Sequence, residues 1–309
     1  MSNSAHKEIL LNIAAVERDT GLAKDTLRVW ERRYGFPSPD RDEHGNRLYS
    51  AEDVEKLRVI RRLLDQGRRP AALIRASTAE LLAQLDEQTP RPETSTSPVD
   101  EADFLQLVKL HRHQELRATL QQALLKQGLQ RFVSETVSAL NKAVGHAWMR
   151  GEVAVPEEHL YSEQVQNLLR NAISTQPDTA SRPRVLLTTF PDEQHGLGIL
   201  MVEAMLVPEG ASCVSLGTQT PLTDIYKAAV DGRFDVVALS FSGAYPLRQA
   251  TEGLAQLRQQ LPAGITLWAG GAGLAGKPTR LPGVRIVSSL EDAVEALREW
   301  RSDHGSSMH

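Results

Sequence analysis

The sequence predicts a multidomain protein with a helix-turn-helix unit, a four-helix bundle and a Rossmann-like α/β domain built on a five-stranded parallel sheet. The observations that predict this order are changes of pattern along the chain. Short helical segments broken by Gly and Pro fill the first 75 residues, only the helical period is found from 102 to 176, and strand, loop and helix alternate from residue 183. The expected boundaries are 8–76, 77–101, 102–178 and 183–302, the second segment being a linker.

The composition is that of an ordinary globular chain, with 309 residues of which 41% are hydrophobic and 24% charged. The sequence has no apolar run of about 18 residues and no signal-peptide layout, so we expect neither a membrane span nor secretion. Cys213 is the single cysteine, which excludes an internal disulfide and fits a reducing cytoplasm. Its setting, SCVSLG, is typical of a buried strand, so a catalytic role is not expected.

Charge is distributed unevenly along the chain. Residues 1–75 contain 15 Lys/Arg and 12 Asp/Glu, a net charge of +3, whereas the other residues contain 20 and 27, a net charge of −7. A basic head on an acidic body favours a polyanionic partner at the N-terminal end.

The N-terminal helices have the layout of a helix-turn-helix. A first short helix ends at Gly21, a second one ends at Gly35, a turn forms around Gly45, and a third helix opens at Ser50. A helix-turn-helix places its second helix in the major groove, with Arg and small polar side chains toward the DNA. A solvated basic helix face is the alternative for any single arginine. The candidate DNA-contacting residues on the second helix are Lys24, Thr26, Arg28, Arg32 and Arg33.

The middle of the chain contains a flexible segment and then helices. Residues 87–101, EQTPRPETSTSPVDE, are rich in Pro, Ser, Thr and Glu, which is typical of a linker. The helical period then predicts four helices at about 102–111, 113–127, 129–150 and 157–175, a set sized for a small bundle.

Polar and small residues gather after three strands of the predicted sheet. DEQHGLG, with Glu193, His195 and Gly198, follows the first strand, Ser240 and Ser242 follow the third, and Gly270-Gly271 follow the fourth. A lone loop histidine is most often unremarkable. Ligands bind at the carboxyl ends of parallel strands, however, and these residues all lie at such ends. A neutral imidazole with a carboxylate behind it is a good metal ligand, and glycines allow a close approach of backbone.

The N-terminal segments TLRVWERRYG, HGNRLYS and EDVEKLRVIRRLLDQG resemble the MerR family of winged-helix regulators across 8–76. The resemblance implies operator DNA as the partner, with Tyr34 added to the recognition helix and Arg47 and Tyr49 placed in the wing. Trp30 is expected in the core. MerR proteins usually continue into a long dimerisation helix, whereas the apolar pattern here soon gives way to the linker. Oligomerisation is therefore expected through the C-terminal module.

The C-terminal pattern E-x-H-x-x-G, followed by SFS and WAGG, resembles the cobalamin-binding fold, whose signature is D-x-H-x-x-G, S-x-L and G-G. By resemblance, His195 is the lower axial cobalt ligand. The displaced dimethylbenzimidazole tail enters the sheet beside Gly198, Ser240 and Gly270-Gly271. The departure is Glu193 in place of Asp.

Glu193 and a second motif are similar to one subgroup, the CarH/LitR photoreceptor regulators. Trp148 precedes Glu158-His159 by nine intervening residues, the subgroup's mark in the helical cap over adenosylcobalamin, and Val155 would line the same face. Met149 stands where some members have a cobalt-capturing His after photolysis, which leaves His146, His159, water or no stable adduct as alternatives.

Together these resemblances imply a cytoplasmic, oligomeric repressor that binds DNA with adenosylcobalamin in the dark and is released by light. The alternatives are a light-independent cobalamin sensor, a regulator with a vestigial pocket as in the MlrA-type proteins, and a corrinoid enzyme subunit. A corrinoid enzyme subunit would have no use for the N-terminal helix-turn-helix domain, so we do not expect an enzyme.

Overall fold

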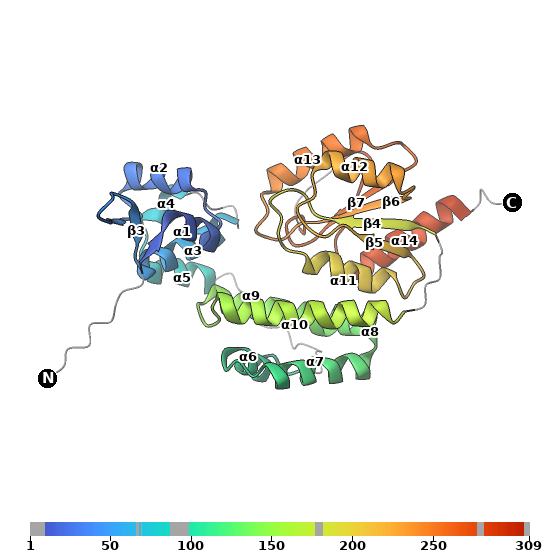
Figure 1. Cartoon of the computed structure of the whole chain (residues 1–309), viewed down its shortest axis with the longest axis horizontal. Helices are drawn as coiled ribbons and strands as arrows, with labels where there is room; N and C mark the ends of the chain where they lie inside the picture. The colour runs from blue at the N-terminus through green and yellow to red at the C-terminus, as the bar shows by residue number, and fades with distance from the viewer. Residues whose placement is uncertain are drawn as a thin grey trace. The chain divides into compact units, whose positions relative to one another are not determined.

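The computed structural model describes residues 10–65, 68, 70–86, 99–176, 182–276 and 281–305. The chain forms two compact units. The first comprises Met1–Thr94 with Met149–Gly151, and the second comprises Ser95–Trp148 with Glu152–His309 (Figure 1). Within the described ranges, no helix has the length and apolar character needed to cross a bilayer.

The first unit is a helical domain with a small antiparallel sheet of order β1-β3-β2. Gly21 and Gly35 end α1 and α2 in the left-handed conformation, as the sequence predicts, because their φ angles are 66° and 70°. Ser50 Oγ accepts from the N–H of Asp53 at 3.1 Å and caps α3. The elements are β1 (Leu11–Asn12), α1 (Ile13–Thr20), α2 (Lys24–Tyr34), β2 (Asp40–Arg41), β3 (Arg47–Tyr49), α3 (Ala51–Asp65), α4 (Pro70–Arg75) and α5 (Thr78–Asp86).

Helix α5 occupies the first part of the segment 77–101 that the sequence analysis assigned to the linker. Ser77 and Glu80 cap this helix reciprocally, with Ser77 N donating to Glu80 Oε2 at 2.8 Å and Glu80 N donating to Ser77 Oγ at 3.2 Å. Leu81 is fully buried in the core of the first unit. Burial of this leucine makes α5 part of the domain rather than of a linker, and residues 87–98 lie outside the described ranges.

The helical part of the second unit matches the four predicted helices, with one addition. The third predicted helix runs without a break through a short α segment, a π-helical turn and a longer α segment. A π-helix inside a long helix displaces the side chains that follow it. The elements are α6 (Glu101–Lys109), α7 (His113–Gln127), α8 (Leu129–Arg131), η1 (Phe132–Val137), α9 (Ser138–Met149) and α10 (Val155–Ser174).

The α/β part is a five-stranded, all-parallel sheet of order β5-β4-β6-β7-β8, with helices on both faces (Figure 1). Helices α11 and α14 pack on one face, where Val185 and Leu187 meet Ile199 and Leu297. Helices α12 and α13 pack on the other. The elements are β4 (Arg184–Thr188), α11 (Leu197–Leu206), β5 (Ser212–Ser215), α12 (Leu222–Asp231), β6 (Val236–Ser240), α13 (Leu247–Gln260), β7 (Thr266–Gly270), β8 (Val284–Val287) and α14 (Leu290–Gly305).

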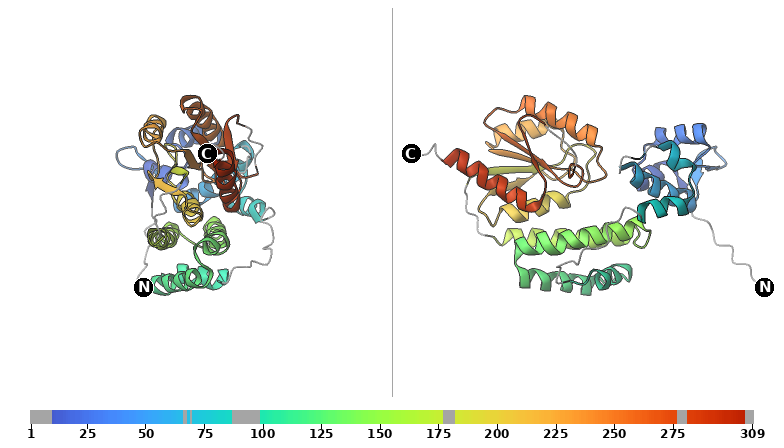
Figure 2. Two further views of the ribbon diagram at one scale, coloured as in Figure 1. Left: turned by 90° about the vertical axis from the view of Figure 1, so that its right-hand side faces the viewer. Right: turned by 180° about the vertical axis from the view of Figure 1, so that it is seen from behind.

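Helix α11 joins the bundle to the sheet. Its residues Leu200, Met201, Ala204 and Met205 belong to the same buried core as the bundle helices, and α8, η1 and α10 contact it (Figure 2). Gln130 Nε2 also donates to the carbonyl oxygen of Met205 at 3.0 Å. The bundle is therefore fixed to the helix that follows the first strand of the sheet.

Candidate ligand-binding site and nucleic-acid interface

The predicted metal ligand lies where the sheet changes its direction of winding. His195 is in the loop between β4 and α11, and Ser242 follows β6, the neighbour of β4 in the sheet. The helices α11 and α12 that follow β4 and β5 cover opposite faces. The carboxyl ends of two such neighbouring strands border the crevice in which open α/β sheets bind ligands.

Glu193 is the centre of a hydrogen-bond network in this crevice. The carboxylate is buried, with 1% exposure, and its Oε1 lies 2.6 Å from His195 Nδ1 and accepts from the His195 N–H at 3.0 Å. Its Oε2 accepts from the N–H of Ser242 at 2.7 Å and from the Ser242 hydroxyl at 2.8 Å. The network fixes the imidazole ring and leaves Nε2 without a hydrogen-bond partner among the described residues.

The network also shifts the pKa values of Glu193 and His195. Burial opposes ionisation of Glu193, but the hydrogen bonds from His195 and Ser242 outweigh it and lower the pKa of the carboxyl below its ordinary value. The hydrogen bond to Glu193 raises the pKa of His195, and the charge of Glu158 on the bundle adds to this rise. Glu158, a predicted cap residue, therefore lies within electrostatic reach of His195.

Threonines that the sequence analysis did not single out hold the loop. Thr189 Oγ1 donates to the carbonyl oxygen of Glu193 at 2.7 Å and accepts from the N–H of Gln219 at 2.8 Å. Thr188 Oγ1 lies 2.7 Å from Thr220 Oγ1. Two polar residues at the end of an otherwise apolar run, VLLTTF, were the signal that could have indicated this role.

The predicted glycines lie at close backbone approaches. A Cβ at Gly198 would overlap Ser240 Oγ, which places the first turn of α11 directly against the end of β6. A Cβ at Gly270 would lie 2.7 Å from the carbonyl oxygen of Val287, and one at Gly271, whose φ is +98°, would overlap the carbonyl oxygen of Phe241. The structure thus brings together all the predicted residues of the α/β domain at one end of the sheet.

The predicted cap residues lie at the adjoining ends of α9 and α10. Trp148 is half-buried against the bundle core, Val155 and Glu158 are half-buried in the first turn of α10, and His159 is exposed. Glu158 Oε2 lies 2.8 Å from His159 Nδ1. The side chain of Met149 lies outside the described residues.

The chemistry of these donors fits a cobalt corrinoid. A histidine that ligates a metal through one ring nitrogen usually donates the N–H of the other to a carboxylate. That hydrogen bond fixes the tautomer and raises the basicity of the ligating nitrogen. Glu193 Oε1 lies 2.6 Å from Nδ1 of His195, and the side chain of His195 is 64% exposed. A corrin supplies the four equatorial nitrogens itself, so one imidazole is the donor that the protein has to provide.

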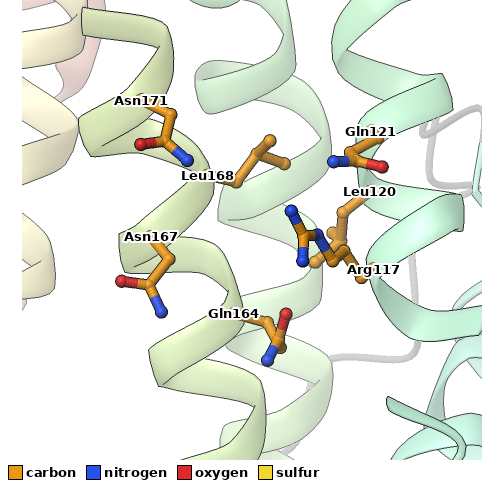
Figure 3. A pocket seen from close by; sticks show the side chains of 7 residues that line it. All are labelled: Arg117, Leu120, Gln121, Gln164, Asn167, Leu168 and Asn171. Atoms are coloured by element: carbon orange, nitrogen blue, oxygen red, sulfur yellow. The ribbon is translucent and has the colours of Figure 1, made fainter. Parts of the chain in front are cut away.

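A separate pocket lies within the bundle, between α7 and α10 (Figure 3). Its volume is about 280 Å³, and no predicted cofactor residue lines it. Its lining is mostly amide side chains with one guanidinium: Arg117, Leu120, Gln121, Gln164, Asn167, Leu168 and Asn171. We assign this pocket no part in the candidate cofactor site.

The predicted recognition helix α2 exposes cations on one face. Leu27 and Trp30 are buried, as expected for Trp30, whereas Arg28, Arg32 and Arg33 are exposed. Arg28 pairs with Asp25 at 2.9 Å, an exposed pair that solvent screens. The other predicted residues of the helix, Lys24, Thr26 and Tyr34, are half-buried, and Lys24 Nζ lies 3.1 Å from Glu17.

The predicted wing is the hairpin of β2 and β3, and one of its two predicted DNA-contacting residues, Tyr49, is buried. Arg47 Nε donates to Glu31 Oε2 at 2.6 Å, which ties β3 to α2. Tyr49 is fully buried, and its hydroxyl has no hydrogen-bond partner among the described residues. The sequence-based assignment of Tyr49 to the DNA-gripping surface is therefore corrected, because its side chain points into the core formed by α1 and α3.

Comparison with known proteins agrees with this architecture. Residues 11–79 match the family described as MerR HTH family regulatory protein, and residues 101–172 and 183–298 match two B12 binding domain families. Two Myxococcus xanthus proteins are similar: the HTH-type transcriptional repressor CarH is 30% identical over 87% of this chain and 90% of its own length, and the repressor CarA is 32% identical over 75% and 76%.

Among solved structures, the monomethylamine corrinoid protein of Methanosarcina barkeri has a TM-score of 0.52 at 16% identity, covering 64% of this chain and 96% of its own. That likeness concerns the fold alone. A helix-turn-helix head, a helical bundle and a parallel sheet with an imidazole at its switch point define a B12-binding transcriptional regulator, not an enzyme. The chain belongs to the MerR-type regulators with B12 binding domains, the family that includes CarH and CarA.

Proposed function

We propose that the protein is a light-responsive repressor that binds operator DNA in the dark with adenosylcobalamin bound. The observation that carries the proposal is the 2.6 Å contact between Glu193 Oε1 and His195 Nδ1, because it presents Nε2 as a metal ligand. The similar Myxococcus proteins are named repressors, which supports the sign of regulation.

In this proposal Nε2 of His195 would hold the cobalt, and Glu193 would keep the imidazole ring in place. When bound, adenosylcobalamin supplies a Co–C bond that visible light cleaves. The residues that would hold its tail are Gly198, Ser240, Ser242, Gly270 and Gly271, and those that would cover its upper face are Trp148, Val155, Glu158 and His159.

In this proposal the helical bundle is the cap over the cofactor, and it would have two preferred positions, one with the adenosyl group bound and one without it. The bundle shares one core with α11, and α11 begins at the loop that carries His195. Loss of the group beside Trp148 and Val155 would change what the ends of α9 and α10 contact, and so the position that the bundle prefers. We propose that the second unit also oligomerises. Neighbouring DNA-binding heads then gain affinity through effective concentration, and they lose it when the assembly separates.

A light-independent cobalamin-sensing regulator is the second candidate. Met149 stands where a cobalt-capturing histidine follows the tryptophan in some members of the photoreceptor subgroup that this chain resembles, so a state captured by that histidine after illumination would not form here. In such a sensor cobalamin level, not light, would set DNA affinity.

The test is made on the full chain, loaded with adenosylcobalamin in the dark. Absorption, molecular mass by light scattering and affinity for DNA selected from a random duplex pool are recorded before and after green light. The photoreceptor requires a bound corrin whose spectrum changes, with a fall in mass and DNA affinity. Unchanged mass and affinity would favour the light-independent sensor, and no bound corrin would indicate a vestigial pocket.

Two histidine variants show whether the site is the one described. His195→Ala should lose the spectrum of the histidine-ligated corrin. His113→Ala, an exposed histidine at the start of α7, should keep it.

A further inference from the structure

Helix α2 has a buried face and an exposed face, and one exposed residue does not fit its surroundings. Leu27 and Trp30 turn into the core of the first unit. At helical spacing, the opposite face carries Asp25, Arg28, Val29 and Arg32, all of them exposed. Val29 is thus an apolar side chain in the middle of a charged face.

The exposure of Val29 is uncommon within this unit. Its relative exposure is 41%, and in the described part of the first unit the other exposed large hydrophobic residue is Leu10, at the start of that part. Valine is also a weaker helix former than the Lys, Arg, Glu or Gln residues that usually occupy an exposed helix face. Neither helix propensity nor burial in the monomer accounts for it.

The cations around Val29 place this face against a polyanion. Arg28 is its neighbour in the chain and pairs with Asp25 through an exposed contact that is easily exchanged. Arg32, almost one turn further on, makes no ion pair with any described residue. Around the helix, Arg28 and Arg32 lie to one side of Val29, and the exposed Arg33 lies to the other. Phosphate contacts made by these cations would hold the short apolar side chain toward the floor of a groove.

We propose that Val29 is a specificity-determining residue that contacts the C5-methyl group of a thymine in the operator, an inference that rests on the proposed DNA binding. The edges of the bases in the major groove present donors, acceptors and a single apolar group, the thymine methyl. A valine cannot satisfy a donor or an acceptor. Its isopropyl group gains only from the methyl, so it selects a T·A pair at one position of each half-site.

The experiment removes the methyl group from the DNA and the isopropyl group from the protein. Full-length wild-type protein selects duplexes from a random pool, and the selected duplex is then resynthesised with deoxyuridine in place of each thymidine in turn. We expect one position per half-site at which uracil weakens binding about fourfold, the factor for losing burial of one methyl-sized group. Val29→Ala should bind the thymine duplex more weakly and show no uracil effect at that position.

Val230→Ala is the matched control, because Val230 has a similar exposure of 36% but lies on α12 of the other unit. It should keep the uracil sensitivity of the wild type. Circular dichroism melting checks that Val29→Ala is folded, which we expect because the side chain is exposed and alanine favours the helix.

The outcomes separate this assignment from DNA binding itself. Suppose that the wild type binds a selected duplex and yet loses no more affinity than Val29→Ala at any uracil position. In that case the Val29 assignment is wrong and the proposed function stands. If the wild type selects no duplex under dark, cobalamin-loaded conditions, the proposed DNA binding is wrong, and this assignment with it.

Discussion

The N–H of Ser242 donates to Glu193 Oε2 at 2.7 Å, although the two residues are 49 positions apart in the chain. The contact joins the loop after β4 to the loop after β6, and the other carboxylate oxygen of Glu193 holds His195. The direction of the imidazole is consequently set by two strands at once. A change at either loop therefore alters the hydrogen bonds that orient His195 without replacing His195 itself.

Glu193→Gln should weaken cobalamin binding about 10- to 100-fold while the domain remains folded. The amide keeps the size of the side chain but loses the charge. Its single oxygen can accept from either His195 or Ser242, and its NH₂ group, a donor, faces the other. The measurement is a titration of the apoprotein with cobalamin in the dark, followed by absorption.

Glu203→Gln is the control for that titration. Glu203 is a half-buried carboxyl on α11 whose pKa is raised by burial, and the hydrogen bonds that Glu193 makes to His195 and Ser242 do not involve it. Cobalamin affinity should be unchanged in this variant. Equal affinity of Glu193→Gln and the wild type would contradict the role given to the carboxylate.

Gly198→Ala should lower the free energy of unfolding by about 1–3 kcal/mol, because the added methyl group overlaps Ser240 Oγ. Ser240→Ala removes that oxygen, so the double variant should recover a large part of the loss. Urea unfolding of the wild type, both single variants and the double variant gives the coupling free energy directly. Additive effects would show that the two residues are not in contact.

Most of the fold could be predicted from the sequence because its signals are local. Glycines after amphipathic segments marked the ends of α1 and α2, and the change of period at residue 183 marked the sheet. The loops that carry Glu193 and Ser242 could be placed together because neighbouring parallel strands end on the same side of a sheet.

The features that sequence reasoning missed depend on tertiary contacts. Strand β3 has three residues. That is too few for an alternating pattern to show which face of the strand lies against the core, and so whether Tyr49 is buried. The π-helical turn Phe132–Val137 is held by Thr136, whose hydroxyl donates to Gln127 Oε1 at 2.8 Å. The role of Thr189 depends on Gln219, 30 residues away. The periodicity of apolar residues along the chain carries no information about such hydrogen bonds between distant residues.

Tyr49→Phe should leave DNA affinity unchanged and should not lower the stability of the first unit. The hydroxyl is buried without a hydrogen-bond partner among the described residues, so removing it relieves a desolvation cost and breaks no bond. Operator binding and thermal unfolding are measured on the full chain. A clear loss of DNA affinity would restore Tyr49 to the DNA-contacting surface.

Asp235→Asn should destabilise the α/β domain at neutral pH and lose that effect in acid. Burial opposes ionisation of Asp235, but hydrogen bonds from the Arg182 guanidinium and the Arg184 N–H outweigh it and lower the pKa of the carboxyl. A carboxyl with a lowered pKa in the folded state contributes stability at pH values above its unfolded pKa of about 3.9. That contribution disappears as the pH falls through the folded value.

The free energy of unfolding of the wild type should thus exceed that of Asp235→Asn by about 1.5–3 kcal/mol at pH 7, the range for a hydrogen bond to a charged group. The difference should shrink progressively below about pH 4, where the unfolded carboxyl takes up its proton first. Urea midpoints at a series of pH values measure it. A difference that stays constant from neutral pH into acid would mean that the ionised carboxylate is not what joins the start of β4 to β6, and that shape alone holds this end of the sheet.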